Sequence, residues 1–166
     1  MAPAARLILG VDPGLASTGY GLVEGGVRVV DCGTIRTGPA AAGVRLLAIA
    51  DAIDALLARH SVDEAALEEL FLGRNRTSAI GVAEARGAVL MTLARAKVTA
   101  YEYKPSQVKA LLTGYGAAGK QQMAKMLQAQ VRGARPDMDD HAVDAVAIAL
   151  CHARTRAVRL AAPAAS

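Results

Sequence analysis

The sequence lacks any long hydrophobic stretch. Its longest segment without a charged residue or histidine is 13–23, eleven residues rich in glycine, whereas a membrane helix needs about 20 consecutive apolar residues. The apolar run at 7–11 meets an Asp-Pro-Gly break, which leaves it too short for a secretory signal core with a cleavage site. We therefore expect no transmembrane span, no contact with membranes and a cytoplasmic protein.

The chain is also poor in cysteine and in charged residues. Cys32 and Cys151 lie far apart with no Cys-x-x-Cys or histidine spacing around them, so one disulfide is formally possible but two reduced thiols are expected. With 53% hydrophobic and 20% charged residues in a chain of 166, the composition excludes disorder as a description of the whole chain and suits one core. We expect one domain over 1–156 and an unstructured tail over 157–166.

Charge is distributed unevenly along the chain. Residues 1–70 carry five Lys or Arg against nine Asp or Glu, residues 71–135 carry eleven against two, and residues 136–166 carry three against four. A basic segment between two acidic ones is typical of a protein that binds a polyanion and holds metal ions with carboxylates. A solvated basic surface without a ligand explains the charge alone equally well.

The hydrophobic pattern alternates between strands and helices. Strands are predicted at 7–11, 20–24, 27–36, 65–70 and 98–103, and helices at 42–59, 77–96, 105–112, 120–131 and 138–154. The glycine pair at 25–26 joins the second and third strands as a tight hairpin. The order predicts an α/β fold with a five-stranded mixed sheet and helices on both faces. Small residues along 77–96 favour a close helix contact, and we consider one between subunits.

Acidic residues stand at three positions where carboxylates can carry chemistry. Asp12 ends the first strand, although an Asp before Pro-Gly is more often a turn residue. Glu68 and Glu69 adjoin within a predicted strand, so alternation sends one toward each face. Asp144 lies one turn inside a nearly all-apolar helix, where an acid needs a cation or a hydrogen-bond partner.

The helical step of about 100° places Asp140, His141 and Asp144 on one side of the last predicted helix. An Asp-rich helix start is first of all a capping signal. Ligands from a strand end, a second strand and this helix would nevertheless form an oxygen-rich site suited to Mg²⁺ or Mn²⁺. Paired hard cations at such a site support phosphodiester hydrolysis.

Four segments carry recognisable motifs, and in this order they resemble one family. They are Gly10-Val11-Asp12-Pro13-Gly14 with Thr18-Gly19-Tyr20-Gly21, Leu67-Glu68-Glu69-Leu70-Phe71 with Asn75, Ala85-Arg86-Gly87, and His141-Ala142-Val143-Asp144-Ala145. The chain resembles the RuvC family, crossover junction endodeoxyribonucleases, from about Leu7 to Cys151. The resemblance implies a ribonuclease-H-like fold, a homodimer, and divalent metal, Mg²⁺ or Mn²⁺, with two ions at each site. It also implies symmetrical nicking of two strands at a four-way (Holliday) DNA junction in recombination and repair, in concert with RuvA and RuvB.

The resemblance also assigns roles to individual residues. Asp12, Glu68 and Asp144 match the family's catalytic metal ligands, and His141 stands where many members have Asp. A neutral histidine ligates through one nitrogen and protonates near pH ~6.5, so we expect activity to fall on acidification and the metal preference to shift toward Mn²⁺. Residues expected to contact DNA are Phe71 as an aromatic wedge, with core packing as its alternative, and the polar side chains Arg74, Asn75, Arg76, Lys109 and Lys120.

Two other classes of protein remain as alternatives. An actin-like or sugar-kinase ATPase shares the Asp12-Pro-Gly and Thr18-Gly19 pattern, but 166 residues leave no room for its second domain. A junction-binding protein with a decayed nuclease site would keep the basic segment, but Asp12, Glu68 and Asp144 are intact. Metal-dependent nicking of junction DNA, with nucleotide hydrolysis as a control, separates the three.

Overall fold

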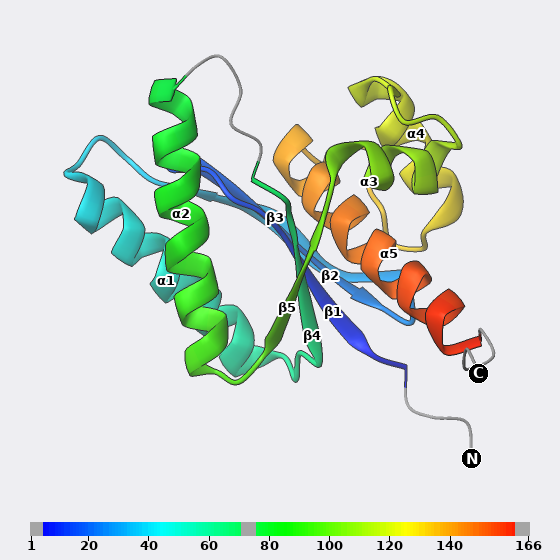
Figure 1. Ribbon diagram of the computed structural model, residues 1–166, viewed down its shortest axis with the longest axis horizontal. Coiled ribbons are helices and arrows are strands. Elements are labelled where there is room, and N and C mark those ends of the chain that lie inside the picture. The colour runs from blue at the N-terminus through cyan, green and yellow to red at the C-terminus, as the bar shows by residue number, and fades with distance from the viewer. Residues whose placement is uncertain (1–4, 71–75, 162–166) are drawn as a thin grey trace, which may run out of the picture.

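Five strands form one mixed sheet, in the order β3-β2-β1-β4-β5, in the computed structural model of the chain (Figure 1). The structure describes residues 5–70 and 76–161, without the side chains at 76–78 and 159–161. The strands are β1 (Leu7–Asp12), β2 (Ser17–Glu24), β3 (Arg28–Arg36), β4 (Glu64–Glu68) and β5 (Thr99–Tyr103). The helices are α1 (Ala42–Arg59), α2 (Arg76–Arg95), α3 (Pro105–Thr113), α4 (Lys120–Gln130) and α5 (Asp140–Ala161).

Strand directions bring functional positions to one edge of the sheet. β1 runs antiparallel to β2, with Asp12 opposite Gly19, and parallel to β4, with Val11 beside Leu67. β5 is parallel to β4. Because parallel strands end at the same edge, β1, β4 and β5 end side by side, and the helix α5 crosses this part of the sheet.

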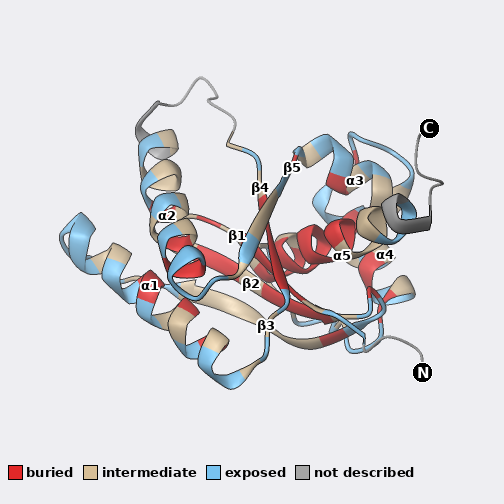
Figure 2. Ribbon diagram, turned by 60° about the horizontal axis from the view of Figure 1, so that its bottom comes forward, coloured by how far each residue is buried: buried red, intermediate tan, exposed pale blue. Residues whose placement is uncertain are grey.

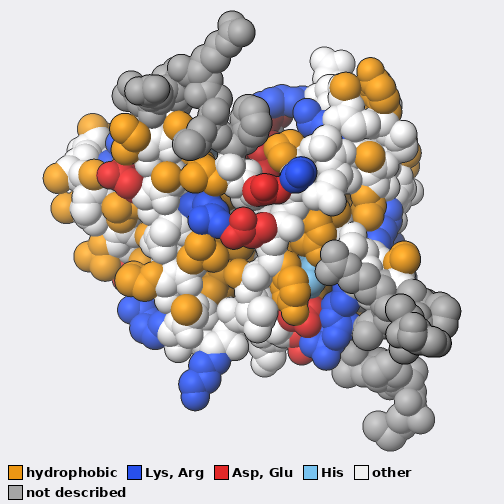
Figure 3. All heavy atoms as spheres, viewed as in Figure 1, with side chains coloured by type: hydrophobic (Ala, Val, Ile, Leu, Met, Phe, Trp, Pro, Cys, Tyr) orange, Lys and Arg blue, Asp and Glu red, His pale blue; other side chains and the backbone are white. Residues whose placement is uncertain are grey.

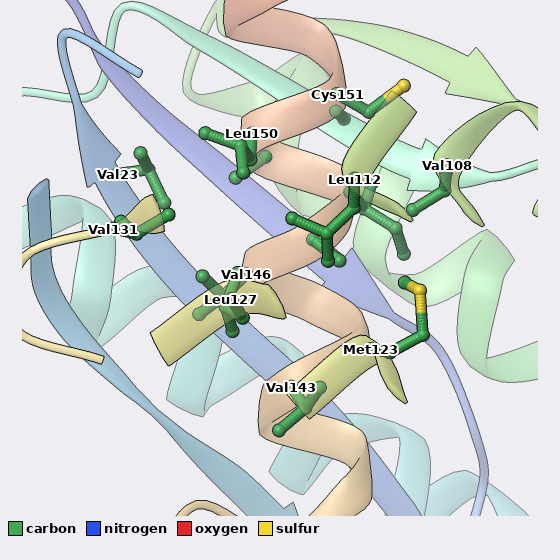
Figure 4. Close-up of a cluster of buried hydrophobic side chains, with 14 of the residues drawn as sticks. Val23, Val108, Leu112, Met123, Leu127, Val131, Val143, Val146, Leu150 and Cys151 are labelled. Atoms are coloured by element: carbon green, nitrogen blue, oxygen red, sulfur yellow. The ribbon is translucent and has the colours of Figure 1, made fainter. Parts of the chain in front are cut away.

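Helices cover both faces of the sheet, and each face has its own core. On one face, α1 and α2 pack on β1, β2 and β4 through a buried cluster that includes Leu9, Ile53 and Val89. On the other face, α3, α4 and α5 form a second cluster. Figure 4 shows Leu112, Leu127 and Val146 among the side chains that these three helices contribute to it. Burial is concentrated along the central strands and α5, while α1 and α2 keep an exposed outer side (Figure 2). The predicted mixed sheet with helices on both faces is confirmed.

The helix α5 lies unusually close to the sheet because glycines face it. A Cβ atom on Gly10 would lie 2.0 Å from the carbonyl oxygen of Ala145, and one on Gly19 would lie 2.0 Å from that of His141. Real Cβ atoms do not approach so closely, so these positions require glycine. The backbone of α5 therefore rests directly on β1 and β2.

Two details differ from the sequence predictions. β2 begins at Ser17 rather than at residue 20, because Ser17 pairs with Arg36 of β3. The last helix continues beyond residue 154 to Ala161, so residues 157–161 of the expected tail are helical. On α2, Ala85, Val89 and Leu93 are buried, whereas Ile80 and Gly87 face outward, where the close contact expected between subunits stays a prediction. Among the described residues, no helix is long and apolar enough to cross a membrane.

Candidate active site

Asp12 is held at the end of β1 by a tight turn. The hydroxyl of the buried Thr18 donates a hydrogen bond to the carbonyl oxygen of Gly14 (2.7 Å) and accepts one from its amide (3.2 Å). A Cβ atom on Gly14 would lie 2.5 Å from the carbonyl oxygen of Ser17, so the turn requires glycine here. The Asp12-Pro-Gly and Thr18 motifs therefore form one unit that fixes the position of the Asp12 carboxylate.

Glu68 is the last residue of β4 and faces the same side of the sheet as Asp12. Its neighbour Leu67 is fully buried in the core on the α1 and α2 side, so alternation turns Glu68 toward α5. The amide of Glu69 donates to the carbonyl oxygen of Tyr103 (2.8 Å), and Glu69 itself is exposed. The structure thus distinguishes the two adjacent acids and brings Glu68 to Asp12.

The first turn of α5 is fixed to the sheet by Asp139. Its carboxylate accepts hydrogen bonds from the backbone amide of Ala142 (3.0 Å), the hydroxyl of Thr34 (2.6 Å) and the guanidinium of Arg36 (2.6 Å). Together these hydrogen bonds and the Arg36 charge outweigh the effect of burial and lower the pKa of Asp139. Asp139 caps the helix and ties its start to β3.

His141 and Asp144 project from α5 toward the strand ends. The Nδ1 atom of His141 lies 3.0 Å from Oδ2 of Asp12, and the His141 side chain is 44% exposed against 22% for Asp12. Asp144 is partly buried one turn further along. The structure therefore brings together Asp12, Glu68, His141 and Asp144 from two strands and one helix.

Burial raises the pKa of all three carboxylates of this group, and charge repulsion adds to it for Glu68 and Asp144. Burial and then the charges of Asp12 and Asp144 raise the pKa of Glu68 to about 7, against the effect of Lys109. Burial and then the charge of Asp12 raise the pKa of Asp144 to about 6, although Lys120 acts in the other direction. Burial also raises the pKa of Asp12, because it outweighs the contact with His141. Such a cluster of half-buried acids favours the binding of cations.

Two lysines stand beside the acids. Lys109 of α3 is close enough to Glu68 to lower its pKa. The ammonium of Lys120, at the start of α4, lies 2.7 Å from the carboxylate of Asp140, and both side chains are exposed. Hydrogen bonding to Asp140 and its charge raise the pKa of Lys120. Asp140, which the sequence places on the side of His141 and Asp144, instead forms an ion pair with Lys120.

A pocket adjoins Glu68 at the carboxyl ends of β4 and β5. Its volume is about 770 Å³, and its lining comprises Glu68, Glu69, Leu70, Lys104, Pro105 and Ser106. Figure 3 shows acidic and basic side chains next to one another near the middle of this face. A mixed surface of this kind can accommodate a phosphate chain beside carboxylates.

The donor set fits a hard divalent cation. Carboxylate oxygens with one imidazole are suited to Mg²⁺ or Mn²⁺, and the mutual repulsion of the acids favours a positive charge between them. Within residues 5–70 and 76–161, however, no three Asp, Glu, His or Cys side chains are gathered closely enough to coordinate one ion as they stand. The side chains face a common edge without forming a closed coordination shell.

Some of the residues expected to bind DNA lie outside the part of the chain that the structure describes. Phe71, Arg74 and Asn75 lie outside the described residues, and so does the side chain of Arg76, although its backbone begins α2.

Two positioning contacts were missed by sequence reasoning. The Asp139 cap had a local signal, an Asp just before a helix, but its partners Thr34 and Arg36 are more than 100 residues away.

Known proteins resemble this chain closely over nearly its whole length. Residues 8–152 match the family model of RuvC, crossover junction endodeoxyribonuclease. The RuvC of Roseiflexus sp. is 45% identical over 152 residues, which cover 89% of this chain and 90% of the relative. The RuvC of Chloroflexus aggregans is 46% identical over 154 residues, which cover 89% and 92%.

The structural comparison agrees with these relatives. The structure of T. thermophilus RuvC in complex with a Holliday junction substrate superposes with a TM-score of 0.83 at 33% identity, covering 93% of this chain and 96% of the other. This match confirms the ribonuclease-H-like fold expected from the sequence. The family match and the curated relatives together show that the chain belongs to the RuvC family of crossover junction endodeoxyribonucleases.

Proposed function

We propose that this protein resolves four-way DNA junctions by nicking two strands symmetrically at the site formed by Asp12, Glu68, His141 and Asp144. The observation that carries the proposal is the convergence of three half-buried carboxylates, with raised pKa values, at one sheet edge beside Lys109 and Lys120. The relative from T. thermophilus was solved with a Holliday junction substrate, which supports the same class of substrate here.

The four side chains would hold divalent metal, Mg²⁺ or Mn²⁺, with two ions at each site. When bound, the ions supply Lewis acidity, which makes water a better nucleophile and stabilises the leaving oxygen of the phosphodiester. His141 holds the Asp12 carboxylate in position. Lys120 offers positive charge to the phosphate oxygens as negative charge develops, once a phosphate replaces Asp140 as its partner. The products are 5′-phosphate and 3′-hydroxyl ends.

DNA contacts extend from the site over the basic middle of the chain. Lys109 and Lys120 would contact the phosphates nearest the reacting bond. From the sequence we assign Phe71 to the junction centre, where it stacks on a base, and Arg74, Asn75 and Arg76, which follow it in the chain, to contacts with DNA. Phosphate contacts position the junction without reading its sequence.

A homodimer would present two such sites to two like strands. An exposed apolar surface on α1 and α2 supports it, since Leu47 and Ile80 are each 60% exposed and Met91 is 57% exposed. A shallow pocket of about 410 Å³ lies between the two helices, with Gly87 and Met91 in its lining. Apolar side chains grouped on one face are typical of subunit interfaces.

We also propose RuvA and RuvB as partners and a cytoplasmic location, because the proposed substrate is DNA undergoing recombination.

The test is to incubate the purified chain with a synthetic four-way junction and with a linear duplex of matched sequence, in Mg²⁺, Mn²⁺ or EDTA, and to map the nicks. Paired symmetrical nicks on the junction alone, dependent on metal, support the proposal. Junction binding without nicking in either metal contradicts it and favours a binding protein. Nucleotide hydrolysis, measured in parallel, would favour the ATPase alternative.

A further inference from the structure

A buried polar cluster lies around the middle of α5, beyond the residues of the candidate active site. His152 is 2% exposed, and its Nδ1 and Nε2 atoms lie 2.7 Å from the Tyr103 hydroxyl and 2.9 Å from the Glu64 carboxylate. The ring of Tyr101 stacks on the imidazole with centroids 4.4 Å apart. The guanidinium of Arg156 lies 3.0 Å from the same carboxylate. The cluster joins α5 to both β4 and β5.

The direction of the hydrogen bonds follows from the chemistry of the partners. An ionised Glu64 carboxylate can only accept, so Nε2 of His152 donates to it. With one proton on Nε2, the Nδ1 atom of a neutral imidazole accepts from the Tyr103 hydroxyl. Tyr103, His152 and Glu64 therefore each have a hydrogen-bond partner in the protein interior, where an unpaired polar group is costly. The arrangement therefore holds α5 in one defined position.

Tyr103 connects this cluster to the strand end that carries Glu68. Its hydroxyl contacts His152, while its backbone carbonyl accepts the amide of Glu69, the residue after Glu68. One residue thus contacts both α5 and the turn that follows Glu68. Tyr103 therefore links α5 at His152 to the backbone next to Glu68.

The position of α5 along its own axis depends on its side chains, both the apolar ones buried in the core, such as Val146 and Ile148, and the polar ones. Its contacts at Gly10 and Gly19 are between backbones, and glycine offers no side chain to interlock with the helix. These contacts set how closely α5 lies on the sheet but constrain sliding along it weakly. The Asp139 contacts fix the start of the helix, and His152, eight residues after Asp144, lies about 12 Å further along the axis.

We propose that His152, Tyr103 and Glu64 are positioning residues that set the placement of α5 on the sheet, and thereby the distance of Asp144 and His141 from Asp12 and Glu68. The inference rests on the proposed cleavage site, because it assigns the reacting groups to these four side chains. Misplacement of reacting groups by about 1 Å can slow a reaction by up to about 100-fold. The cluster therefore affects the rate of cleavage without touching DNA or metal.

The experiment compares junction cleavage, junction binding and thermal stability in His152→Leu, Tyr103→Phe and His152→Gln. We expect kcat to fall about 10-fold in His152→Leu, with junction Kd within about two-fold of wild type and a higher metal concentration needed for half-maximal rate. Glutamine can both donate to Glu64 and accept from Tyr103, so His152→Gln recovers part of the rate. Tyr103→Phe removes the hydroxyl alone, which keeps the test valid if His152→Leu does not fold.

A destabilised control separates positioning from general loss of stability. Ile53→Ala removes a fully buried side chain of α1, away from α5, and should lower Tm by as much as the cluster variants while leaving kcat within about two-fold well below Tm. The inference is overturned if folded Tyr103→Phe and His152→Leu cut at the wild-type rate, or if Ile53→Ala loses as much kcat at equal Tm. A wild-type protein that cuts no junction would instead overturn the proposed function.

Discussion

The imidazole of His141 lies 3.0 Å from the carboxylate of Asp12, although 129 residues separate them in the chain. Asp12 ends a central strand and His141 belongs to the first turn of α5, so their contact joins the two parts of the candidate site. Gly19 makes the contact possible, because it pairs with Asp12 in the sheet and lies directly under the backbone of His141. A glycine thus allows two side chains of the proposed site to approach each other.

Replacing Gly19 by alanine should therefore damage both stability and cleavage. The new Cβ atom would lie 2.0 Å from the His141 carbonyl oxygen, and backbone cannot yield as a flexible side chain does. We expect Gly19→Ala to lower the free energy of unfolding by about 1–3 kcal/mol or more and to move His141 away from Asp12. Denaturant unfolding and junction cleavage measure the two effects.

Gly38→Ala is the matched control for this substitution. A Cβ atom at Gly38 meets nothing within 4 Å, so its free energy of unfolding should stay within about 0.5 kcal/mol of wild type. Equal effects of the two substitutions would show that the close approach of α5 to Gly19 does not matter.

The buried pair of Glu64 and His152 should make stability depend on pH in acid. Burial acts to raise the pKa of Glu64, but the hydrogen bonds of His152 and Arg156 and the charge of Arg156 outweigh it, so the folded pKa lies below the ordinary value of 4.5. The unfolded chain therefore binds more protons in acid. The contribution of Glu64 to the free energy of unfolding is complete above about pH 4.5 and is lost as pH falls through the pKa of Glu64 in the folded protein. We expect Glu64→Gln to cost about 1–3 kcal/mol at pH 7 and progressively less below pH ~4.

Thermal unfolding of Glu64→Gln across this pH range measures the effect, with Glu24→Gln as the control. Glu24 also pairs with an arginine, Arg28, but its side chain is 38% exposed, and exposed ion pairs contribute about 0–1 kcal/mol. A Tm difference between wild type and Glu64→Gln that stays constant from pH 7 to pH ~3 would contradict the assigned role of the carboxylate.

Lys120 should contribute more to cleavage than to binding. Hydrogen bonding and charge from Asp140 raise the pKa of Lys120, and the charges of Asp144 and Asp12 add to this, so its ammonium stands near the proposed site of the reacting phosphate. We expect Lys120→Ala to slow cleavage about 10- to 100-fold and to weaken junction binding modestly. Single-turnover cleavage and junction titrations distinguish the two.

Lys125→Ala provides the comparison on the same helix. Lys125 is exposed on α4, and its loss should reduce the salt dependence of binding with little effect on the single-turnover rate. If Lys125→Ala slows cleavage as much as Lys120→Ala does, proximity to the acids is not what distinguishes Lys120.

The exposed apolar surface of α1 and α2 should be required for subunit association. Met91 lines the shallow pocket between α1 and α2 together with Gly87, so Met91→Glu places a charge in this surface. Burying an unpaired charge in an interface is costly. We expect monomers by sedimentation and loss of paired nicking on one junction. Val158→Glu alters another exposed apolar residue, 70% exposed on α5, and should leave the oligomeric state unchanged. A stable dimer in Met91→Glu would exclude this surface.

The sequence predicted the elements because their patterns are local. The short segment at 65–70 between a break and a helical stretch indicated the strand, and the Asp-rich start after Pro136 indicated the last helix. Glu68 and Asp144, which these elements carry, reach the same edge of the sheet. Sequence reasoning stopped the last helix too early, although the alanine, arginine and leucine residues after 154 are all strong helix formers. That error came from treating a terminal segment as a tail.

Contacts between distant segments could not be predicted in the same way. The ion pair of Lys120 with Asp140 depends on how α4 and α5 meet, and the hydrogen bond of Tyr103 with His152 depends on where α5 crosses β5. Neither follows from periodicity, since the partners lie on different elements. The motif order identified the family, while these contacts required the three-dimensional arrangement.

The most direct test of the account is Asp12→Asn, measured for junction binding and for metal-dependent nicking side by side. Asparagine keeps the size of the side chain and removes the charge that raises the pKa of both Glu68 and Asp144. We predict junction binding near the wild-type level and a loss of nicking of at least about 100-fold in both Mg²⁺ and Mn²⁺. Nicking at the wild-type rate by folded Asp12→Asn would show that the carboxylate cluster is not the cleavage site.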